Sequence, residues 1–491
     1  MEKTITLQLS QIVGGEDIST SPLERKLYSH DAAPIPDFLS LFFKPMPDVI
    51  VRPESADEVA RILRLASDYR VPVIPRAAGS WSLGGVTPVK GGIVLDLVKL
   101  NKIGKLSIDG LWVEVEAGVV WQDLMEQLLE KGATVLSYPT SAPSATVGGW
   151  VSTGGYGIGS LKYGHIGEQI EAMEVITPKG EILHVSKDSA DPKIEWFFGT
   201  EGQLGVISKL KLRIRNKPEE SSMHGVYVAG HKELAELISE FIKLREVPYC
   251  LKILDSGLVA LRSMLSNREM EDKNLILAAF EGSAEEASYA TTTFNQIVNQ
   301  RGLQPSDKDL AQAEWQERYY SMRIGRLGPT LLGGETIIPI EQLEPVLGEI
   351  KSLQKKYNLK IGIEAQVISK EWVLILAMYL ADERKALRYI TQLALIRDII
   401  NIGLSHGGKP YGIGLWNSVY VKQQFGKEYL KELKSVKRRL DPEGIMNPGK
   451  FFRAETRFGI PINMILYDTF MNILSFARRF QWEGLPWRSP S

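Results

Sequence analysis

The chain has 491 residues, which is too long for one ordinary hydrophobic core, so two or three domains are expected. Its composition is that of a globular protein, with 44% hydrophobic and 24% charged residues. The 58 Lys and Arg residues nearly balance the 59 Asp and Glu residues, so the charge does not favour a nucleic-acid partner. Cys250 is the single cysteine. One thiol excludes an internal disulfide, a zinc cage and an iron–sulfur cluster ligated by this chain alone.

The N-terminal residues lack the charged start and the continuous apolar stretch of a signal peptide. No window of the sequence holds enough uninterrupted apolar residues to cross a bilayer. We therefore expect a cytoplasmic protein.

The first third of the chain is a series of short strands. A strand at 47–53 precedes a helix at 56–69, and a second strand at 71–75 leads through a small-residue loop into a third strand at 92–97. This order is strand–loop–strand. It argues against a Rossmann phosphate loop, which needs a helix N-terminus directly after its glycines.

A helix at 120–131 and a hairpin at 172–185 follow, and Pro218 ends this region. From 219 to 405 the strands alternate with longer helices. Such alternation is typical of an antiparallel sheet with helices on one face, so the expected fold class is α+β.

The strongest local signal is the small-residue loop after the second strand. A pyrophosphate needs several converging backbone N–H donors, which requires small residues and unusual dihedrals. Ala77, Ala78 and Gly79 let the backbone come close, and Ser80 and Ser82 offer hydroxyls. Alone, such a loop is more often a simple turn. The candidate cofactor-binding residues here are Pro75, Arg76, Ala77, Ala78, Gly79, Ser80, Trp81 and Ser82.

Two further glycine-dense blocks occur, at 139–164 and at 198–207. Each glycine costs backbone entropy on folding, so stability alone explains this many glycines poorly. The candidate cofactor-binding residues in these blocks are Pro139, Thr140, Ser141, Thr146, Gly148, Gly149, Ser152, Thr153, Gly155, Tyr163, Val206 and Ile207.

Together the blocks resemble the FAD-binding module of the vanillyl-alcohol-oxidase family, also called the p-cresol-methylhydroxylase family. The most similar branch is that of the glycolate-oxidase and D-lactate-dehydrogenase subunits. The match is dense over 47–215 and returns at 438–451, where Asn447 joins the candidate FAD residues. The resemblance implies a two-subdomain FAD-binding domain, an antiparallel-sheet cap with helices on one face, and a C-terminus that returns to the FAD domain.

The domains implied are an FAD-binding domain at 1–218, a substrate or cap domain at 219–410, a C-terminal return at 411–455 and an amphipathic tail at 456–491. The resemblance also implies that 76–82 cradles the FAD pyrophosphate. The segment 139–155 would line the isoalloxazine and ribityl chain, and the backbone of Val206 and Ile207 would meet the adenine.

Several relatives attach FAD covalently through a histidine directly after the glycines of the first loop. Ser80 occupies that position here, and serine cannot form the histidyl bond, so the expected FAD is non-covalent. Trp81 is unusual at its place. It either stacks near the cofactor or is a packed aromatic residue.

The cap departs from the pattern of the branch, which usually has a His-x-His run on a cap strand and a later Glu-His-Gly run. The corresponding strand contains Glu364 and no histidine. The later run allows two alignments, one that uses His406 and one that places Tyr411 at the histidine position. No metal site is therefore expected, because such sites need imidazole together with carboxylate ligands. His406 is either a general base or a hydrogen-bonded loop residue.

Arg318 follows Trp315 in a run that resembles a family position whose arginine binds the substrate carboxylate. A guanidinium suits that role because it binds a carboxylate through two parallel hydrogen bonds. Neighbouring polar positions of the family pattern are Met322 and Gly333 here, so a structural salt bridge is an equal alternative for Arg318. The candidate catalytic residues are His406, Arg318, Tyr411 and Glu364.

The family implies an FAD-dependent dehydrogenase that oxidises a small hydroxyl-bearing substrate, a 2-hydroxy acid, by hydride transfer to flavin N5. The chain has no second redox centre, so electrons would pass to an iron–sulfur protein, another partner or a quinone. Alternatives are an FAD enzyme acting on an alcohol, a sugar or an ether-lipid precursor, and a non-catalytic flavin subunit for electron transfer.

The segment 460–487 places apolar residues on one helical face, with Arg478 and Arg479 near its end. This pattern predicts an amphipathic helix that contacts a partner subunit, the inner face of a membrane or this chain's own domains. Polar residues and an early proline exclude a membrane-spanning helix.

Overall fold

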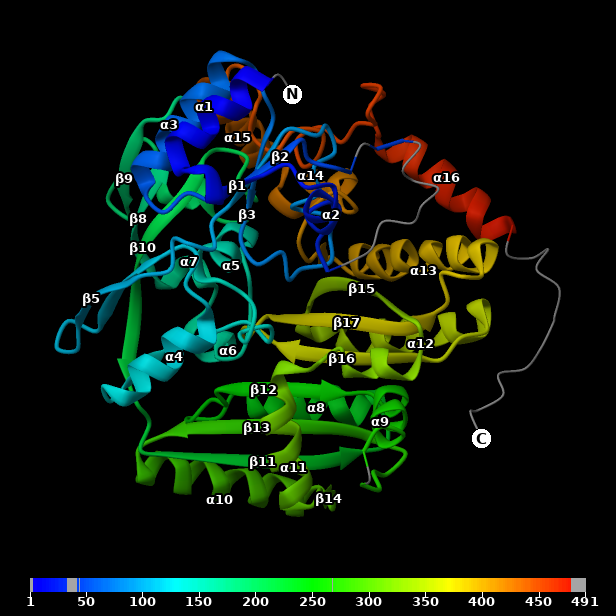
Figure 1. Cartoon of the computed structure of the whole chain (residues 1–491). Helices are drawn as coiled ribbons and strands as arrows, with labels where there is room; N and C mark the ends of the chain where they lie inside the picture. The colour runs from blue at the N-terminus through cyan, green and yellow to red at the C-terminus, as the bar shows by residue number, and fades with distance from the viewer. Residues whose placement is uncertain (1–2, 33–41, 44, 267, 478–491) are drawn as a thin grey trace.

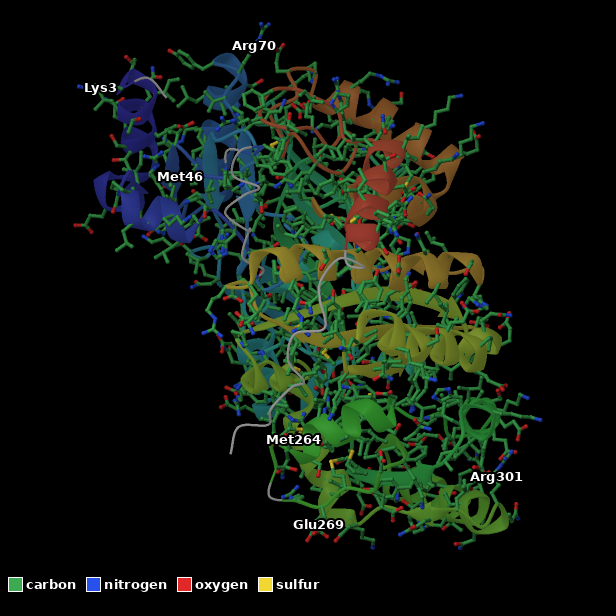
Figure 2. All side chains as sticks on the ribbon, turned by 90° about the vertical axis from the view of Figure 1, so that its right-hand side faces the viewer. Lys3, Met46, Arg70, Met264, Glu269 and Arg301 are labelled. Atoms are coloured by element: carbon green, nitrogen blue, oxygen red, sulfur yellow. The ribbon has the colours of Figure 1, made fainter. Side chains whose placement is uncertain are left out.

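The structure is a computed structural model, and it describes residues 3–32, 42–43, 45–266 and 268–477. Its architecture is the expected α+β fold. Figure 1 shows a first domain of two small sheets above a second domain that is built on one large sheet. The side-chain view in Figure 2 shows both regions filled with packed side chains between their ribbons.

The first subdomain contains a four-stranded sheet in the order β1-β2-β4-β3. Its central pairs, β2 with β4 and β3 with β4, are parallel. Ser55 caps α3 by accepting a hydrogen bond from the Glu58 backbone N–H at 3.3 Å. The elements are α1 (Lys3–Val13), β1 (Ile18–Ser19), β2 (Val49–Val51), α3 (Ala56–Asp68), β3 (Val73–Arg76) and β4 (Ile93–Asp96).

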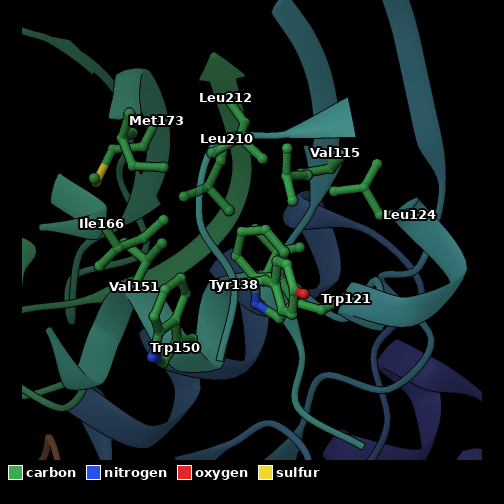
Figure 3. Close-up of a cluster of buried hydrophobic side chains, with 14 of the residues drawn as sticks. Val115, Trp121, Leu124, Tyr138, Trp150, Val151, Ile166, Met173, Leu210 and Leu212 are labelled. Carbon is green, nitrogen blue, oxygen red and sulfur yellow. The ribbon is translucent and has the colours of Figure 1, made fainter. Parts of the chain in front are cut away.

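The second subdomain is an antiparallel sheet in the order β5-β6-β10-β8-β9, and β7 also pairs with β10. The predicted hairpin at 172–185 is the β8–β9 pair. Figure 3 shows the core beneath this sheet, where Trp121 and Trp150 meet edge to face, with ring centroids 5.2 Å apart. The elements are β5 (Ile103–Ser107), β6 (Trp112–Glu116), α4 (Trp121–Glu130), β7 (Ala133–Val135), α5 (Val147–Thr153), β8 (Ile170–Ile176), β9 (Ile182–Ser186) and β10 (Val206–Asn216).

The cap domain contains an eight-stranded sheet in the order β14-β11-β13-β12-β16-β17-β15-β18, with every named pair antiparallel. Its strands are β11 (Glu220–Val228), β12 (Cys250–Leu254), β13 (Asn274–Gly282), β14 (Gln304–Pro305), β15 (Thr330–Pro339), β16 (Ile361–Val367), β17 (Trp372–Ala381) and β18 (Lys409–Pro410).

One face of the cap sheet packs against four long helices in a single apolar core. These helices are α8 (His231–Phe241), α10 (Ala284–Gln300), α12 (Leu343–Tyr357) and α13 (Ala386–Ser405). Two shorter helices, α9 (Ser256–Ser263) and α11 (Lys308–Gln316), cover part of the other face. The helix α13 runs on to Ser405, and the first left-handed backbone after it is at Gly407, where φ is 76°.

Side chains alternate between the two faces of a sheet, so only every second residue of a cap strand faces this core. On β16, Ile361, Ile363 and Ala365 face the helices, so Glu364 and Gln366 point to the opposite side. That opposite side faces the first domain.

The chain then returns to the first domain. Met446 forms a parallel bridge to Val73 of β3, and the backbone N–H of Asn447 donates to the Val73 carbonyl at 2.8 Å. The helix α15 (Lys427–Leu440) precedes this bridge. Asp441 stabilises the following turn by accepting hydrogen bonds from the backbone N–H groups of Ile445 and Met446.

The described part of the predicted tail helix is α16 (Met464–Ala477), which lies along α13. It begins after Asn463, whose side chain accepts a hydrogen bond from the Leu466 backbone N–H at 2.9 Å. Arg397 of α13 donates to the Asn472 side chain at 2.7 Å. The remainder of the predicted tail, 478–491, lies outside the described residues. No helix in the described part of the chain is long and apolar enough to span a bilayer.

Candidate active site

A cavity of about 590 Å³ lies between the two domains. Its walls are the three glycine-dense segments of the first domain, the opposite side of the cap sheet and the loop that precedes β15. This volume falls within the range typical of ligand sites, about 300–1,000 Å³.

Most of the predicted FAD residues line this one cavity, although they come from segments far apart in the sequence. Gly79 has a positive φ of 65°, which lets the first loop turn along the wall of the cavity. The predicted residues that line the cavity are Pro75, Ala77, Ala78, Gly79, Ser80, Trp81, Pro139, Thr140, Ser141, Thr146, Gly148, Gly149, Ser152, Thr153, Val206 and Ile207.

The glycines of the second block bring α5 close to its neighbours. A Cβ at Gly148 would lie 2.4 Å from the Ala117 Cβ, and a Cβ at Gly149 would lie 2.9 Å from the Ala77 Cβ. Both distances are too short for real side chains. Gly148 therefore lets α5 pack closely on Ala117, and Gly149 lets it pack closely on Ala77 of the first loop. Both glycines also line the cavity, where a backbone without side chains fits the close approach that a dinucleotide needs.

Five predicted FAD residues do not line the cavity. Arg76 donates to the His30 carbonyl at 2.8 Å, and Gly155 packs against Trp150 because a Cβ there would overlap the indole ring. Tyr163 packs against Tyr249, with ring centroids 6.2 Å apart. The other two residues are Ser82 and Asn447.

Asn447 connects two cavity segments to the returning chain. Its side-chain amide donates to the carbonyls of Gly85, at 3.1 Å, and Glu201, at 2.8 Å. The Asn447 backbone has a φ of 46°, in the left-handed region that asparagine tolerates better than most residues. Asn447 therefore holds the cavity-lining segments at Gly85 and Glu201 in position.

Glu201 is a buried cavity-lining carboxyl that was not among the residues predicted from the sequence. It accepts hydrogen bonds from the backbone N–H groups of Gly414, at 2.8 Å, and Ile413, at 3.3 Å. Burial raises the pKa of Glu201 to about 7, and burial likewise lowers the pKa of nearby Lys450 to about 7. These contacts hold the returning segment against the first domain.

The cap side of the cavity contains a buried ion cluster around Glu364. Its carboxylate contacts Lys252 at 2.8 Å and Arg262 at 2.5 Å, and it accepts a hydrogen bond from the Ser321 hydroxyl at 2.8 Å. Burial acts to raise the pKa of Glu364, but the two cations outweigh it and hold the pKa at about 2. Glu364 is therefore ionised, and both of its oxygens are in contact with Lys252, Arg262 or Ser321.

Two arginines on the loop before β15 also line the cavity. Arg323 contacts Glu314 at 2.5 Å and Glu317 at 2.8 Å. Arg326 is exposed, and it forms no ion pair within the described part of the chain. The cap end of the cavity therefore presents a guanidinium that is available to an anion.

The structure does not bring Arg318 or His406 to this cavity. Arg318 donates to the Tyr138 hydroxyl at 2.9 Å and lies over the Trp315 ring, 4.5 Å from its centroid. His406 ends α13 and contacts Glu349 and Gln342 of the neighbouring helical layer, each at 2.9 Å. The geometry thus gives His406 no access to a substrate in the cavity.

Tyr411 does line the cavity, together with Glu364. The Tyr411 hydroxyl donates to the Tyr156 carbonyl at 3.2 Å and accepts from the Tyr156 backbone N–H at 3.1 Å. Its ring lies 5.6 Å from that of Trp81. Of the two alignments considered from sequence, the one that uses Tyr411 agrees with the position of the cavity.

Glu335 is a further cavity-lining carboxyl, on β15. Burial raises its pKa to about 7, opposed only by a hydrogen bond from Trp81. No sequence motif marks Glu335, and the one available signal was a single acid within the strand Thr330–Pro339.

Within the described residues, no group of three or more His, Cys, Asp or Glu side chains is placed to hold a metal ion.

Comparison with known proteins agrees with this geometry. Residues 47–186 match the FAD binding domain family, and residues 217–451 match the family of FAD linked oxidases, C-terminal domain. The glycolate oxidase subunit GlcD of Bacillus subtilis (strain 168) is 25% identical, over 93% of this chain and 98% of that protein. The D-lactate dehydrogenase of Anaerostipes hadrus is 24% identical, over 84% of this chain and 91% of that protein.

Solved structures show the same fold. A p-cresol methylhydroxylase with substrate bound has a TM-score of 0.78 at 16% identity, covering 91% of this chain and 96% of that one. An alkyldihydroxyacetonephosphate synthase has a TM-score of 0.71 at 19% identity, covering 92% of this chain and 85% of that one.

The two-domain fold and its glycine-lined cavity therefore define an FAD-dependent oxidoreductase. The chain belongs to the FAD-linked oxidases of the vanillyl-alcohol-oxidase, or p-cresol-methylhydroxylase, family. It is related at low identity to glycolate oxidase subunits and D-lactate dehydrogenases.

Proposed function

We propose that this protein is a dehydrogenase that oxidises a small 2-hydroxy acid with a non-covalently bound FAD. The observation that supports this proposal is a single cavity. Its walls include both the FAD-type loops and two arginines of the cap domain, Arg323 and Arg326. The loop 77–81, α5 and the Val206–Ile207 backbone would hold the cofactor. When bound, FAD accepts a hydride from the substrate carbon. The protein's own residues must bind the substrate carboxylate and take up the hydroxyl proton.

Arg326 is the proposed carboxylate-binding residue. A guanidinium can bind a carboxylate through two parallel hydrogen bonds, and Arg326 lines the cavity without an ion-pair partner among the described residues. Arg323 lies one helical turn earlier, and its contacts with Glu314 and Glu317 keep that turn in place. The carboxylate role that was predicted for Arg318 is thus better supported for Arg326.

The experiment is anaerobic flavin bleaching of the purified holoenzyme by D-lactate, glycolate, simple alcohols and sugars. A hydroxy acid should bleach the flavin, and Arg326→Ala should raise its KM by 10-fold or more, because a charge-assisted hydrogen bond is worth about 1.5–3 kcal/mol. Arg384→Ala, on an arginine 74% exposed in its side chain, is the matched control. Bleaching by alcohols or sugars alone would reject the hydroxy-acid assignment.

The same preparation tests the cofactor linkage and the acceptor. Ser80 lines the cavity where a histidyl attachment would be made, so acid precipitation should leave all flavin in the supernatant. Flavin in the pellet would reject the non-covalent proposal. We propose that electrons leave through an iron–sulfur or other acceptor protein, which agrees with a relative being named a subunit. Air should then reoxidise the bleached flavin slowly, and rapid reoxidation would identify oxygen as the acceptor.

We also propose that α16 contacts the cytoplasmic face of a membrane. It exposes an apolar face on which Ile465 is 79% and Ile473 59% exposed, and Leu466 and Phe470 lie beside them. Its one charged residue, Asp468, is half-buried. The sequence continues after α16 with three arginines and two tryptophans in 478–491. Exposed apolar residues followed by cations and tryptophans are typical of an interfacial helix.

Sedimentation with vesicles tests this contact. The full chain should bind vesicles of one-third phosphatidylglycerol in phosphatidylcholine, and Ile473→Glu should reduce the bound fraction at least fivefold. Leu7→Glu, at a residue 60% exposed on α1, is the matched control and should bind as the wild type does. Equal binding by Ile473→Glu, or no binding by the wild type, would reject membrane contact through α16.

A further inference from the structure

The geometry points to Glu335 as the group that accepts the substrate's hydroxyl proton. This inference rests on the proposed function. In the step, the substrate O–H bond breaks and its proton moves to a Glu335 carboxylate oxygen. The C–H bond breaks and its electron pair leaves as hydride to the flavin, the two-electron acceptor. The carbon–oxygen bond becomes a carbonyl, so a hydroxy acid yields an oxo acid.

The strand register places Glu335 on the cavity side of the cap sheet. Its neighbours Gly334 and Thr336 face α13, since a Cβ at Gly334 would lie 3.0 Å from Ile399 and Thr336 packs on Gly403. Because side chains alternate along a strand, Glu335 must point the other way, toward the first domain.

Glu335 also lies in register with the ion cluster. Glu335 pairs with Leu376 of β17, and Leu376 pairs with Glu364 of β16, so the two acids are two strands apart on one face. This spacing is about 9–10 Å between their backbones. The two carboxyl groups therefore lie on the same side of the sheet, and both line the same cavity.

The other cavity-lining carboxyls of the described residues already have strong partners. Asp31 accepts the Gly84 backbone N–H at 2.5 Å, Glu201 accepts two backbone N–H groups, and Glu364 is held by two cations and a hydroxyl. Among the described residues Glu335 forms no ion pair, and its hydrogen-bond partner is the Trp81 indole. By this comparison Glu335 is the carboxyl that can take a proton without disrupting a structural contact.

The surroundings also suit a proton acceptor. Tyr411 is near enough for Glu335 to raise its pKa, and burial raises the pKa of Glu335 itself to about 7. The adjoining strands carry Glu364 on β16 and Lys409 on β18, and Asp31, Glu201, Arg323 and Arg326 also line the cavity. Among the described residues none of these groups forms an ion pair with Glu335. Such a carboxyl exchanges its proton near neutral pH, where general-base catalysis is most effective.

The test uses Glu335→Gln in the FAD-loaded full chain. The variant should keep its flavin content and lose on the order of 10²–10⁴-fold in the rate of bleaching by the hydroxy acid found above. The wild-type rate should rise with pH and level off above about 7, because the carboxylate is the acting form, whereas the variant should lack this dependence. Glu349→Gln, an exposed acid on α12 with a side chain 52% exposed, is the matched control.

A second measurement does not need turnover. The infrared difference spectrum between pH 5.5 and 8.5 should contain protonated-carboxyl absorption from both Glu201 and Glu335. Glu335→Gln should remove the Glu335 component of this absorption, and Glu349→Gln should retain both components. Bleaching of Glu335→Gln within threefold of the wild-type rate, or a carboxyl band unchanged by the substitution, overturns the assignment. If no hydroxy acid bleaches the wild-type flavin, the proposed function fails first, and the infrared result alone then reports the protonation of Glu335.

Discussion

Gly148→Val should leave the protein without FAD. A Cβ at Gly148 would lie 2.4 Å from the Ala117 Cβ, 2.8 Å from its Cα and 3.0 Å from its carbonyl oxygen. Backbone atoms on a strand margin cannot move aside as the end of a long side chain can. The valine would therefore push α5 into the cavity that Gly148 and Gly149 line.

The expected cost is about 1–3 kcal/mol in stability from overpacking, together with complete loss of bound flavin. The ratio of flavin to protein absorbance measures the loss, and the thermal midpoint measures the stability. Gly348→Val is the matched control. Gly348 lies on α12 with no heavy atom within 4 Å of the Cβ position, so this variant should retain full flavin. A Gly148→Val protein with wild-type flavin content would show that α5 does not form the FAD wall.

Glu364→Ala should be the most destabilising substitution in the cap. It would leave Lys252, 7% exposed in its side chain, buried without its carboxylate partner, whereas Arg262, 3% exposed, keeps its contact with Glu314 at 2.6 Å. Breaking a buried ion pair by removing one member costs about 3–5 kcal/mol, because the remaining charge is uncompensated. The loss should appear as a lower unfolding midpoint of the cap.

The same residue predicts a pH dependence. The pKa of Glu364 is about 2 in the folded protein, against 4.5 for the free group. A lowered carboxyl pKa stabilises the fold fully above pH 4.5, and this contribution declines as the pH falls from 4.5 toward 2. The difference in midpoint between wild type and Glu364→Gln should shrink over that interval.

An exposed ion pair provides the control for both measurements. Glu236, 50% exposed in its side chain, contacts Arg301 at 3.3 Å, and Glu236→Ala should cost only about 0–1 kcal/mol. Equal losses for Glu364→Ala and Glu236→Ala would contradict the description of the cluster as a buried network.

The FAD wall was predictable because its requirements are local. Gly79 needs a positive φ, and Gly148 and Gly149 need space for close backbone packing, and these properties belong to the residue type. A run of such residues beside strands therefore carries a signal in the sequence itself. Asn447 was predicted for the same wall, but its role in connecting Gly85 to Glu201 depends on the return of the chain.

The cap chemistry was less predictable because it depends on register. Arg318 and His406 match positions of the family pattern, but Arg318 stacks on Trp315 and His406 contacts Glu349 outside the cavity. Neither outcome follows from residue type. Arg326 and Glu335 occur in segments without a recognisable motif, and only the position of β15 in the sheet brings them to the cavity.

The amino-acid sequence by itself therefore determined the α+β class, the family and the FAD-type loops, because glycine and small-residue requirements act on neighbouring residues along the chain. The tertiary structure alone decided which acids and which arginines line the cavity. Those positions depend on which strands pair, in what register, and on which side of the sheet each alternate side chain lies.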